Sequence, residues 1–483
     1  MHIGVIQRLV GLLIMLFSIS LLPPIVVDLI YDENTTEVFL YSYVVLVVTG
    51  FFLYLPAKNN KTDLRLRDGF VVVVLFWAVL GVVGALPFVL YEPLGIDFAD
   101  SLFESISGLT TTGATVLFGL DELPHSFLYY RQQLQWLGGM GIIVLAVAIM
   151  PMLGIGGMQL YKAETPGPVK DSKLTPRIAE TAKALWYIYL GLTVSCALAY
   201  WLAGMSVFDA VTHSFSTVSI GGFSTHDASI GYFQSPMIES VAVLFMLLGG
   251  INFALHFLSV RSLSLGHYFR DSEFQMYISV LTFVSIISVF YLYSQEVFPE
   301  FSDAMRHGVF HAVSIGTTAG FVTSEFAAWP VFIPVLLLFS SFIGGCAGST
   351  GGGIKAMRVL LLIKQGQREL LRLIHPNAQV VVKIGKQPVD NRVIDAVWGF
   401  FAAYVACFVI MMLLLMLSGL DQITAFSAVA ATINNLGPGL GDVSVNYSSL
   451  ATFDKYVLCF SMLLGRLEIF TLLVLFMPAF WRK

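Results

Sequence analysis

The chain has 483 residues, of which 57% are hydrophobic and only 12% are charged, and its formal net charge is -5. Soluble domains contain roughly 25% charged residues, so this composition excludes an ordinary soluble enzyme and makes the lipid bilayer the expected solvent. The negative net charge argues against a nucleic-acid partner. The four cysteines stand inside apolar stretches without the spacing of a metal site or a disulfide framework, which predicts small packing residues.

Ten apolar stretches are long enough to cross a membrane, since a spanning helix needs about 20 mostly apolar residues. They lie near residues 4–30, 36–55, 69–91, 126–153, 178–204, 234–260, 274–294, 329–364, 393–418 and 456–480. Four shorter segments between them are too short and too polar to span, and they lie near 98–110, 207–218, 301–314 and 421–432. We expect these segments to enter the membrane and return to the same side. The sequence therefore predicts an all-α integral membrane protein with ten transmembrane helices.

Lysine and arginine are distributed unequally along the chain. Basic residues are dense at 58–67, 162–183 and 355–392, and none occurs at 68–130 or 184–260. Cytoplasmic loops of membrane proteins are enriched in these two residues. The pattern therefore predicts that both termini are cytoplasmic and that the short segments dip into the membrane from outside.

A fourfold pattern begins at residue 69, in which a helix, a short segment, a glycine-containing turn and a second helix recur in the same order. The turns are Thr110, Thr111, Thr112 and Gly113; Ser219, Ile220, Gly221 and Gly222; Thr317, Thr318, Ala319 and Gly320; and Asn434, Asn435, Leu436 and Gly437. Their last glycines are 109, 98 and 117 residues apart, by subtraction of these numbers. We expect an N-terminal two-helix unit followed by four pore units, at 1–66, 67–160, 161–262, 263–375 and 376–483.

Each pore unit has two spanning helices and so begins and ends in the cytoplasm, which makes the four units parallel. Inverted repeats, the common plan of secondary transporters, need an odd number of spans per unit. Parallel units can close around an axis, where glycine lets the backbone turn carbonyl oxygens inward to replace the water shell of a cation. Acidic residues on the outer side would concentrate cations there: Asp97, Asp100, Glu104, Asp121, Asp209, Asp227, Glu325 and Asp442. The sequence predicts one cation pore with the four turns as its filter.

The second helix of the third unit is interrupted at 344–353, where six of ten residues are glycine. Non-helical backbone at membrane depth is tolerated only where protein covers it or where it lines a cavity. A close-packing glycine face is the alternative interpretation, and a phosphate-binding loop is disfavoured because the GxxxxGK[ST] pattern is absent. We expect a flexible gate across the inner pore, formed by Gly345, Gly348, Gly351, Gly352 and Gly353.

The second helix of each unit carries a related signature: Leu137-Gly138-Gly139, Leu248-Gly249-Gly250, Ile343-Gly344-Gly345 and Leu464-Gly465-Arg466. Arg466 stands where the signatures of the other three units have glycine. It lies about ten residues into the predicted helix 456–480, or roughly 15 Å from its outer end. An arginine at mid-bilayer is costly and must face a cavity or a partner. We expect it to face the pore and oppose cations below the filter. An ion pair with Glu468 is the alternative, which is disfavoured because residues two apart on a helix do not face each other.

These residues resemble the Trk/Ktr/HKT superfamily of potassium transport membrane subunits, most closely its TrkH branch, over nearly the whole chain. The four turns resemble the family's filter, 344–353 its intramembrane gating loop and Arg466 its pore arginine. The first two helices are similar to those that distinguish TrkH from the shorter Ktr subunits. The fourth turn departs most from the pattern, with Asn434, Asn435 and Leu436 in place of threonine or small residues, so the resemblance leaves the symmetry of the ion sites open.

The resemblance implies potassium uptake across the bacterial inner membrane by a homodimer with one pore per protomer. It also implies a cytosolic, nucleotide-binding, TrkA-like regulatory ring on the basic inner face, besides membrane lipid. We expect no organic cofactor on this chain, because no strand–GxGxxG–helix unit occurs in it.

Two other functions are alternatives. A proton- or sodium-coupled secondary transporter of potassium is disfavoured by the parallel units and by the scarcity of carboxylates within the spans. An enzyme that processes a metabolite in the membrane would need a catalytic cluster, and the predicted spans contain none. We therefore expect a transport protein and not an enzyme.

Overall fold

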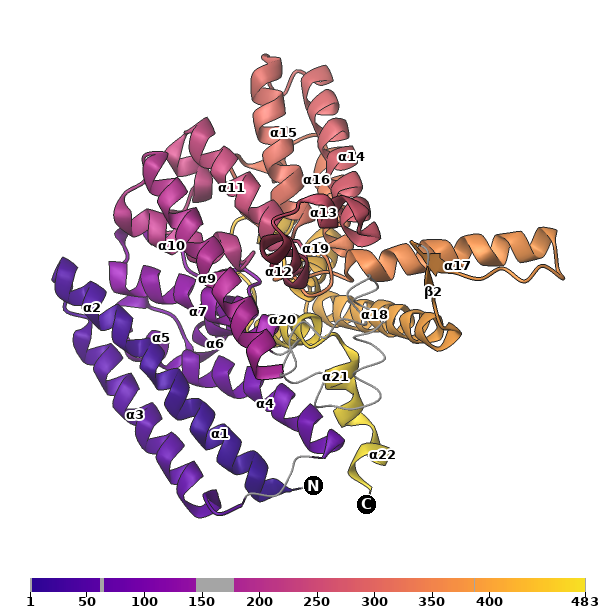
Figure 1. The fold of residues 1–483 in the computed structure, drawn as a ribbon. Helices are drawn as coiled ribbons and strands as arrows, with labels where there is room; N and C mark the ends of the chain where they lie inside the picture. Colours follow the sequence, from indigo (N-terminus) through magenta and orange to yellow (C-terminus); the bar gives the residue numbers. More distant parts are fainter. Residues whose placement is uncertain (1, 61–64, 145–177, 386, 483) are drawn as a thin grey trace.

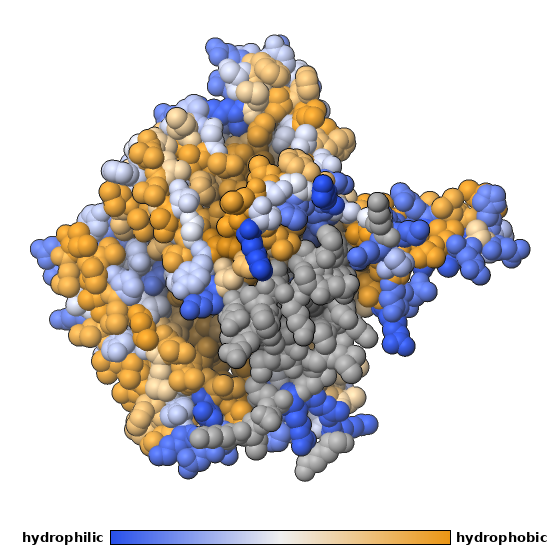
Figure 2. Space-filling model, in the orientation of Figure 1, coloured by the Kyte–Doolittle hydropathy of each residue, from blue (hydrophilic) through white to orange (hydrophobic). Residues whose placement is uncertain are grey.

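The computed structural model describes residues 2–60, 65–144, 178–385 and 387–482. These residues form mostly α-helices, with one antiparallel hairpin of two short strands, β1 (Lys383–Ile384) and β2 (Gln387–Pro388). Figure 2 shows hydrophobic residues over much of the helical surface, as expected for helices that face lipid. The prediction of a mostly helical protein with apolar, membrane-type helices is confirmed.

The first helices form a hairpin along one side of the molecule (Figure 1). α1 (Ile3–Ser18) continues through a short 3-10 turn into α2 (Leu22–Tyr31), and α3 (Thr36–Tyr54) returns beside them. The buried Asp28 carboxylate accepts a hydrogen bond from the backbone N–H of Thr36 at 2.8 Å. This bond satisfies a free N–H group at the start of α3 and so fixes where that helix begins.

Longer helices alternate with short buried ones in the rest of the described chain. The longer and connecting helices are α4 (Leu66–Gly84), α5 (Leu86–Leu90), α7 (His125–Val144), α9 (Ile178–Leu202), α11 (Pro236–Gly249), α12 (Phe253–Ser262), α13 (Gly266–Arg270), α14 (Ser272–Ser294), α16 (Phe332–Ile343), α17 (Ala356–Ile374), α18 (Asn391–Leu417), α20 (Thr452–Arg466), α21 (Phe470–Leu473) and α22 (Pro478–Trp481). The short buried helices are α6 (Phe98–Leu109), α10 (Val207–Val218), α15 (Phe301–Gly316) and α19 (Gln422–Ile433). Each short helix lies between two longer ones along the chain.

The short helices begin at the protein surface and end inside it. Three of them start at a side chain that accepts a backbone N–H, Asp97 for α6, Ser206 for α10 and Asp421 for α19. Their C-terminal halves are almost entirely buried, and so is that of α15. Because the C-terminal end of a helix carries a partial negative charge, four such ends in the interior favour a cation there.

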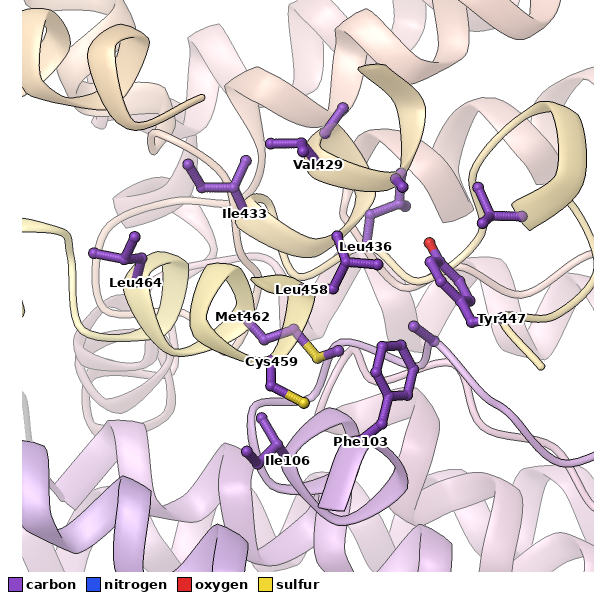
Figure 3. Close-up of a cluster of buried hydrophobic side chains, with 14 of the residues drawn as sticks. Phe103, Ile106, Val429, Ile433, Leu436, Tyr447, Leu458, Cys459, Met462 and Leu464 are labelled. Carbon is purple, nitrogen blue, oxygen red and sulfur yellow. The ribbon is translucent and has the colours of Figure 1, made fainter. Parts of the chain in front are cut away.

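A large apolar cluster joins the beginning of this arrangement to its end. Figure 3 shows Phe103 and Ile106 of α6 next to Leu458, Cys459 and Met462 of α20, and all five side chains are buried. The two helices are more than 300 residues apart in sequence. Their packing closes the chain of helices from α6 to α20 into a ring.

Two helices that the sequence predicts as continuous are broken, and a third is interrupted where the sequence predicts it. α11 and α12 are bent by 97°, and α20 is bent by 109° against residues 470–476. The predicted span 329–364 is divided into α16 and α17 by the glycine-rich segment, so its interruption is confirmed. Breaks arise where the backbone leaves the helical region, as at Glu468 and Ile469, whose φ angles are 55° and 53°.

The number of ten spans stays a prediction, because the described residues account for part of them. Among the described residues, six helices are long and apolar enough to cross a membrane, or eight when each bent pair counts as one span. The end of the predicted span 126–153 lies outside the described residues. Hydropathy measures how apolar a stretch is and not whether its backbone turns, so it reads a bent pair as one helix.

α17 and α18 extend together beyond the rest of the molecule (Figure 1). α17 carries basic side chains such as Lys364 and Arg372, and its Leu373 and Ile374 are exposed. The β1–β2 hairpin lies between the two helices in sequence. This projecting arm therefore offers both charge and apolar surface to a neighbour.

Candidate functional site

The four predicted turns share one backbone conformation at the ends of the short helices. The third residue of each turn donates its N–H to the carbonyl oxygen five positions earlier, at 2.7–2.9 Å: Thr112, Gly221, Ala319 and Leu436. The second residue of each has a φ angle between 52° and 72°: Thr111, Ile220, Thr318 and Asn435. This bonding and this left-handed residue are those of the Schellman helix end. The fourth turn differs in its side chains but not in its backbone.

The last glycine of each turn faces the backbone of the next turn. A Cβ atom added to it would lie 2.0–2.7 Å from the carbonyl oxygen of the third residue there, and the pairs are Gly113 with Gly221, Gly222 with Ala319, Gly320 with Leu436, and Gly437 with Thr112. The fourth pair returns to the first turn, so the contacts form a closed cycle. The φ angles of these glycines are +80° to +101°, so a side chain there is both strained and obstructive.

An outer cavity of about 380 Å³ opens above this cycle. Gly113, Gly222, Gly320 and Gly437 all line it, and Glu325 contributes a carboxylate. The sixteen predicted filter residues are thus brought together, with their glycines at the floor of one cavity. The backbone of the four turns therefore forms part of the cavity wall.

Two of the acidic residues predicted at the outer mouth have a different role. Glu104 is fully buried and forms an ion pair of 2.6 Å with Arg131, and Asp100 forms one of 2.5 Å with Lys455. These carboxylates are paired because an unpaired buried charge is costly. They hold the helices together and do not offer free negative charge to an ion.

His226 forms a polar cluster at the edge of the outer cavity. Its ring contacts the carboxylates of Asp121 and Asp209 and stacks on Tyr232 with 3.5 Å between ring centroids. Burial acts to lower the pKa of His226, but the contacts with the carboxylates of Asp209 and Asp121 outweigh it, so that the pKa is raised. Burial acts to raise the pKa of Asp209, but its contact with His226 and the hydrogen bonds from Ser206 and Thr225 outweigh burial and lower the pKa.

The glycine-rich segment 344–353 lies against the inner side of the turns. Thr350 Oγ1 donates to Val218 O at 2.9 Å, directly before the second turn. Gly352 N donates to Thr318 Oγ1 at 2.7 Å in the third turn. Gly353 N donates to Asn434 O at 3.0 Å in the fourth. The segment therefore contacts the last three turns from below.

Arg466 contacts the first turn, the one turn that the hydrogen bonds of the glycine-rich segment given above do not include. Its Nη2 atom donates to Thr111 Oγ1 at 2.7 Å, and both Nη atoms lie 3.3 Å from Thr350 O. It is the last residue of α20 and is 7% exposed, so the prediction that it lies in the middle of a helix is wrong. Glu468 forms an ion pair of 2.7 Å with Arg358. The guanidinium group of Arg466 therefore contacts both the first turn and the glycine-rich segment.

Several polar residues that support the site were missed by the sequence reasoning. Glu273 Oε1 accepts hydrogen bonds from Ala347 N at 2.6 Å and from Met357 N at 3.2 Å. Ala347 lies within the glycine-rich segment, and Met357 lies in the first turn of α17. On α7, the side chain of Gln135 donates to Gly221 O in the second turn, and that of Gln132 donates to Phe223 O directly after it. Polar residues within apolar stretches are the signal that could have indicated them.

Comparison with known proteins identifies the family. A family model described as TrkH, cation transport protein, matches residues 35–483. The chain belongs to the TrkH family. This confirms the resemblance that the four turns, the glycine-rich segment and Arg466 indicated.

Individual relatives match over the full length. The Trk system potassium uptake protein TrkH of Salmonella typhimurium is 54% identical over 483 residues, which are 100% of both chains. The protein of the same name from Vibrio parahaemolyticus is 56% identical over 480 residues, 99% of each chain. A crystal structure of the potassium transporter TrkH from Vibrio parahaemolyticus matches with a TM-score of 0.93 at 53% identity and covers 100% of both chains. The TrkH fold therefore extends over the entire chain.

Proposed function

We propose that this chain takes up potassium across the bacterial inner membrane through one pore on the axis of the four turns. The closed cycle of glycine and carbonyl contacts carries this proposal, because it surrounds a single axis with backbone oxygens. Rings of such oxygens replace the hydration shell of potassium in known filters. Relatives of 54–56% identity carry the name of potassium uptake proteins, which supports potassium as the transported ion.

The filter comprises the four turns at 110–113, 219–222, 317–320 and 434–437. Each short helix adds the negative end of its dipole below the outer cavity, and the Schellman bonds keep backbone N–H groups directed into the helix ends. A cation on the axis then meets oxygen atoms and few donors. The same features would repel an anion.

The gate comprises the segment 344–353 and Arg466. Their hydrogen bonds to the turns close the inner end of the filter in this conformation. Conduction requires the segment to move away from the axis and Arg466 to leave Thr111. The six glycines of the segment lower the cost of that rearrangement.

The architecture proposed for this function is a two-helix unit at 1–66 and parallel pore units at 67–160, 161–262, 263–375 and 376–483, with ten membrane crossings in all. Both termini would be cytoplasmic. The hydrogen bonds of His2 to Asp68 and of Arg67 to Arg482 support this arrangement, because they tie the two ends of the chain to the start of α4.

The assembly proposed is a homodimer in membrane lipid with a TrkA-like nucleotide-binding ring on its inner face. The projecting arm of α17 and α18 supports a neighbour at that place, since it combines basic residues with exposed apolar ones. The names of the relatives refer to a Trk system, which supports further components.

Flux of potassium and of sodium into proteoliposomes, compared at zero membrane potential, tests the proposal. We expect potassium flux down its gradient without a second ion gradient. Flux that reverses only with a proton or sodium gradient would instead support the coupled transporter.

A further inference from the structure

Gln135 of α7 holds the backbone on both sides of Gly222. Its Nε2 donates to Gly221 O at 2.6 Å, and its Oε1 accepts from Phe223 N at 3.1 Å. The side chain is fully buried. One amide group therefore fixes the orientation of the two peptide groups that flank the filter glycine of the second turn.

Gly221 has no side chain because the Gln135 amide fills that space. A Cβ atom added to Gly221 would lie 2.4 Å from Cδ of Gln135 and 2.5 Å from its Oε1. The φ angle of Gly221 is not left-handed, so the backbone itself does not require glycine. The equivalent position of the third turn is Ala319, which has the same hydrogen bond to its helix. Gly221 and Gln135 thus form a matched pair.

This pair makes the second turn different from the other three. The carbonyl oxygen of Gly221 accepts a side-chain hydrogen bond, whereas the described part of the chain shows none to the equivalent oxygens of Thr112, Ala319 and Leu436. The residues at the position of Gln135 in the other second helices, counted from the Leu-Gly-Gly-type signatures, are Met246, Ser341 and Met462. Only the first unit supplies an amide there.

We propose that Gln135 is a positioning residue that sets the preference of the filter for potassium over sodium. Ion selectivity depends on the number and field strength of the coordinating carbonyl dipoles. The N–H of Gln135 draws charge from the Gly221 oxygen and restrains its approach to the axis. Without this donor the oxygen has a stronger field and more freedom, and both changes favour the smaller sodium ion. The inference rests on the proposed filter and adds a determinant outside the turns.

The first test replaces Gln135 by leucine and by glutamate and measures potassium and sodium flux into proteoliposomes. Loss of one buried hydrogen bond of about 1 kcal/mol predicts a potassium-to-sodium ratio lower by roughly fivefold. Gln133→Leu is the matched control, because Gln133 is buried on the same helix and the described structure gives it no hydrogen bond to the second turn. It should keep the wild-type ratio. A wild-type ratio in folded Gln135→Leu would overturn the inference.

The second test is a double-mutant cycle of Gly221→Ala and Gln135→Ala. Gly221→Ala alone should impair transport, because its methyl group meets the amide. The double variant should recover flux but keep a low potassium-to-sodium ratio, since the second turn then lacks its clamp. Equal impairment by Gly221→Ala with and without Gln135 would overturn the pairing. If Gln135→Leu does not fold, this cycle still tests whether Gln135 acts on the second turn through Gly221.

Gly113→Ser in the same assay distinguishes a failure of the Gln135 inference from a failure of the proposed filter. A changed ratio in Gly113→Ser with an unchanged ratio in Gln135→Leu would leave the filter standing and refute the role of Gln135. Unchanged ratios in both would refute the filter.

Discussion

The Nη2 atom of Arg466 donates a hydrogen bond to Thr111 Oγ1 at 2.7 Å, and this bond places a positive charge directly beneath the first turn of the ring. Thr111 is one of the four left-handed residues that define the turns. The same guanidinium contacts Thr350 of the glycine-rich segment. Arg466 therefore connects the proposed filter to the proposed gate, and in that proposal its charge opposes a cation that leaves the filter inward.

Replacing Arg466 by alanine should increase cation flux. A unit charge about 6–8 Å from an ion repels it by about 2–3 kcal/mol at an effective dielectric constant of about 20. That energy corresponds to roughly a 30–150-fold change in occupancy of the inner end of the pore. Potassium flux into proteoliposomes that contain the purified variant is the measurement.

Lysine and glutamine at position 466 distinguish charge from geometry. Lysine keeps the charge and should keep much of the barrier, whereas glutamine should lose most of it. Thermal unfolding of the same samples tests the structural account, in which Arg466 mainly holds Thr111 and Thr350 together. Early melting of Arg466→Ala without faster flux would favour that account.

The positions of the turns could be predicted from the sequence because their chemistry recurs. Gly113, Gly222, Gly320 and Gly437 follow short helices at similar intervals, and the conformation of each turn depends on local hydrogen bonds. The interruption at the glycine-rich segment could be predicted in the same way, since its composition is incompatible with a continuous helix. Both features depend on residues close together in sequence, so a single sequence is enough to predict where they lie.

The supporting contacts could not be predicted, because they join residues far apart in sequence. Nothing in the sequence around Gln135 indicates that its amide bonds Gly221, which is 86 positions away. The contact of Glu273 with Ala347 spans 74 positions. The bend after Arg466 was missed because the stretch around it remains apolar while the backbone turns.

Gly113→Ser should weaken the discrimination between potassium and sodium. A side chain at this position meets Gly221 O, which an added Cβ would approach to 2.1 Å, and the φ angle of +80° strains any residue other than glycine. Displacement of one carbonyl changes the size and field of the ring. The ratio of the two fluxes in proteoliposomes is the measurement, and Gly119→Ser is its control. Gly119 is also left-handed but has open space around its Cβ position.

Shortening the segment 346–352 should raise basal flux without altering ion preference. The deletion removes the contacts of Thr350 and Gly352 with the turns, and these contacts lie on the inner side of the filter. Altered preference with unchanged basal flux would assign the segment to the filter instead.

Thr350→Val is a milder version of the same test. It removes the hydrogen bonds of Thr350 Oγ1 to Val218 O and Gly249 O and preserves the shape of the side chain. Basal flux should rise by a smaller factor than with the deletion. Thr193→Val, at a buried threonine of α9 that bonds Tyr189 O, controls for the loss of a buried hydroxyl and should leave flux unchanged.

The stabilisation that His226 contributes should decline as the pH rises above neutrality. Its folded pKa lies above the ordinary value of 6.5, so the protonated form is favoured by folding. This stabilisation is fully present below about pH 6.5 and is lost as the pH rises through the folded pKa. The pKa of Asp209 is lowered from 3.8, so its stabilisation is present above about pH 4 and is lost only in acid. Both contributions are therefore complete between about pH 4 and 6.5.

Melting temperatures of the wild type and of His226→Gln, measured at several pH values, check this prediction. The wild type should exceed the variant most near pH 5.5, and the difference should shrink as the pH rises through the folded pKa of His226. Asp121→Asn removes one of the two carboxylates that raise the pKa of His226. In that background the decline should begin at lower pH, because the remaining partner, Asp209, supports a smaller shift. A difference between wild type and His226→Gln that is constant over this range would mean that His226 stabilises the outer mouth by stacking on Tyr232 alone.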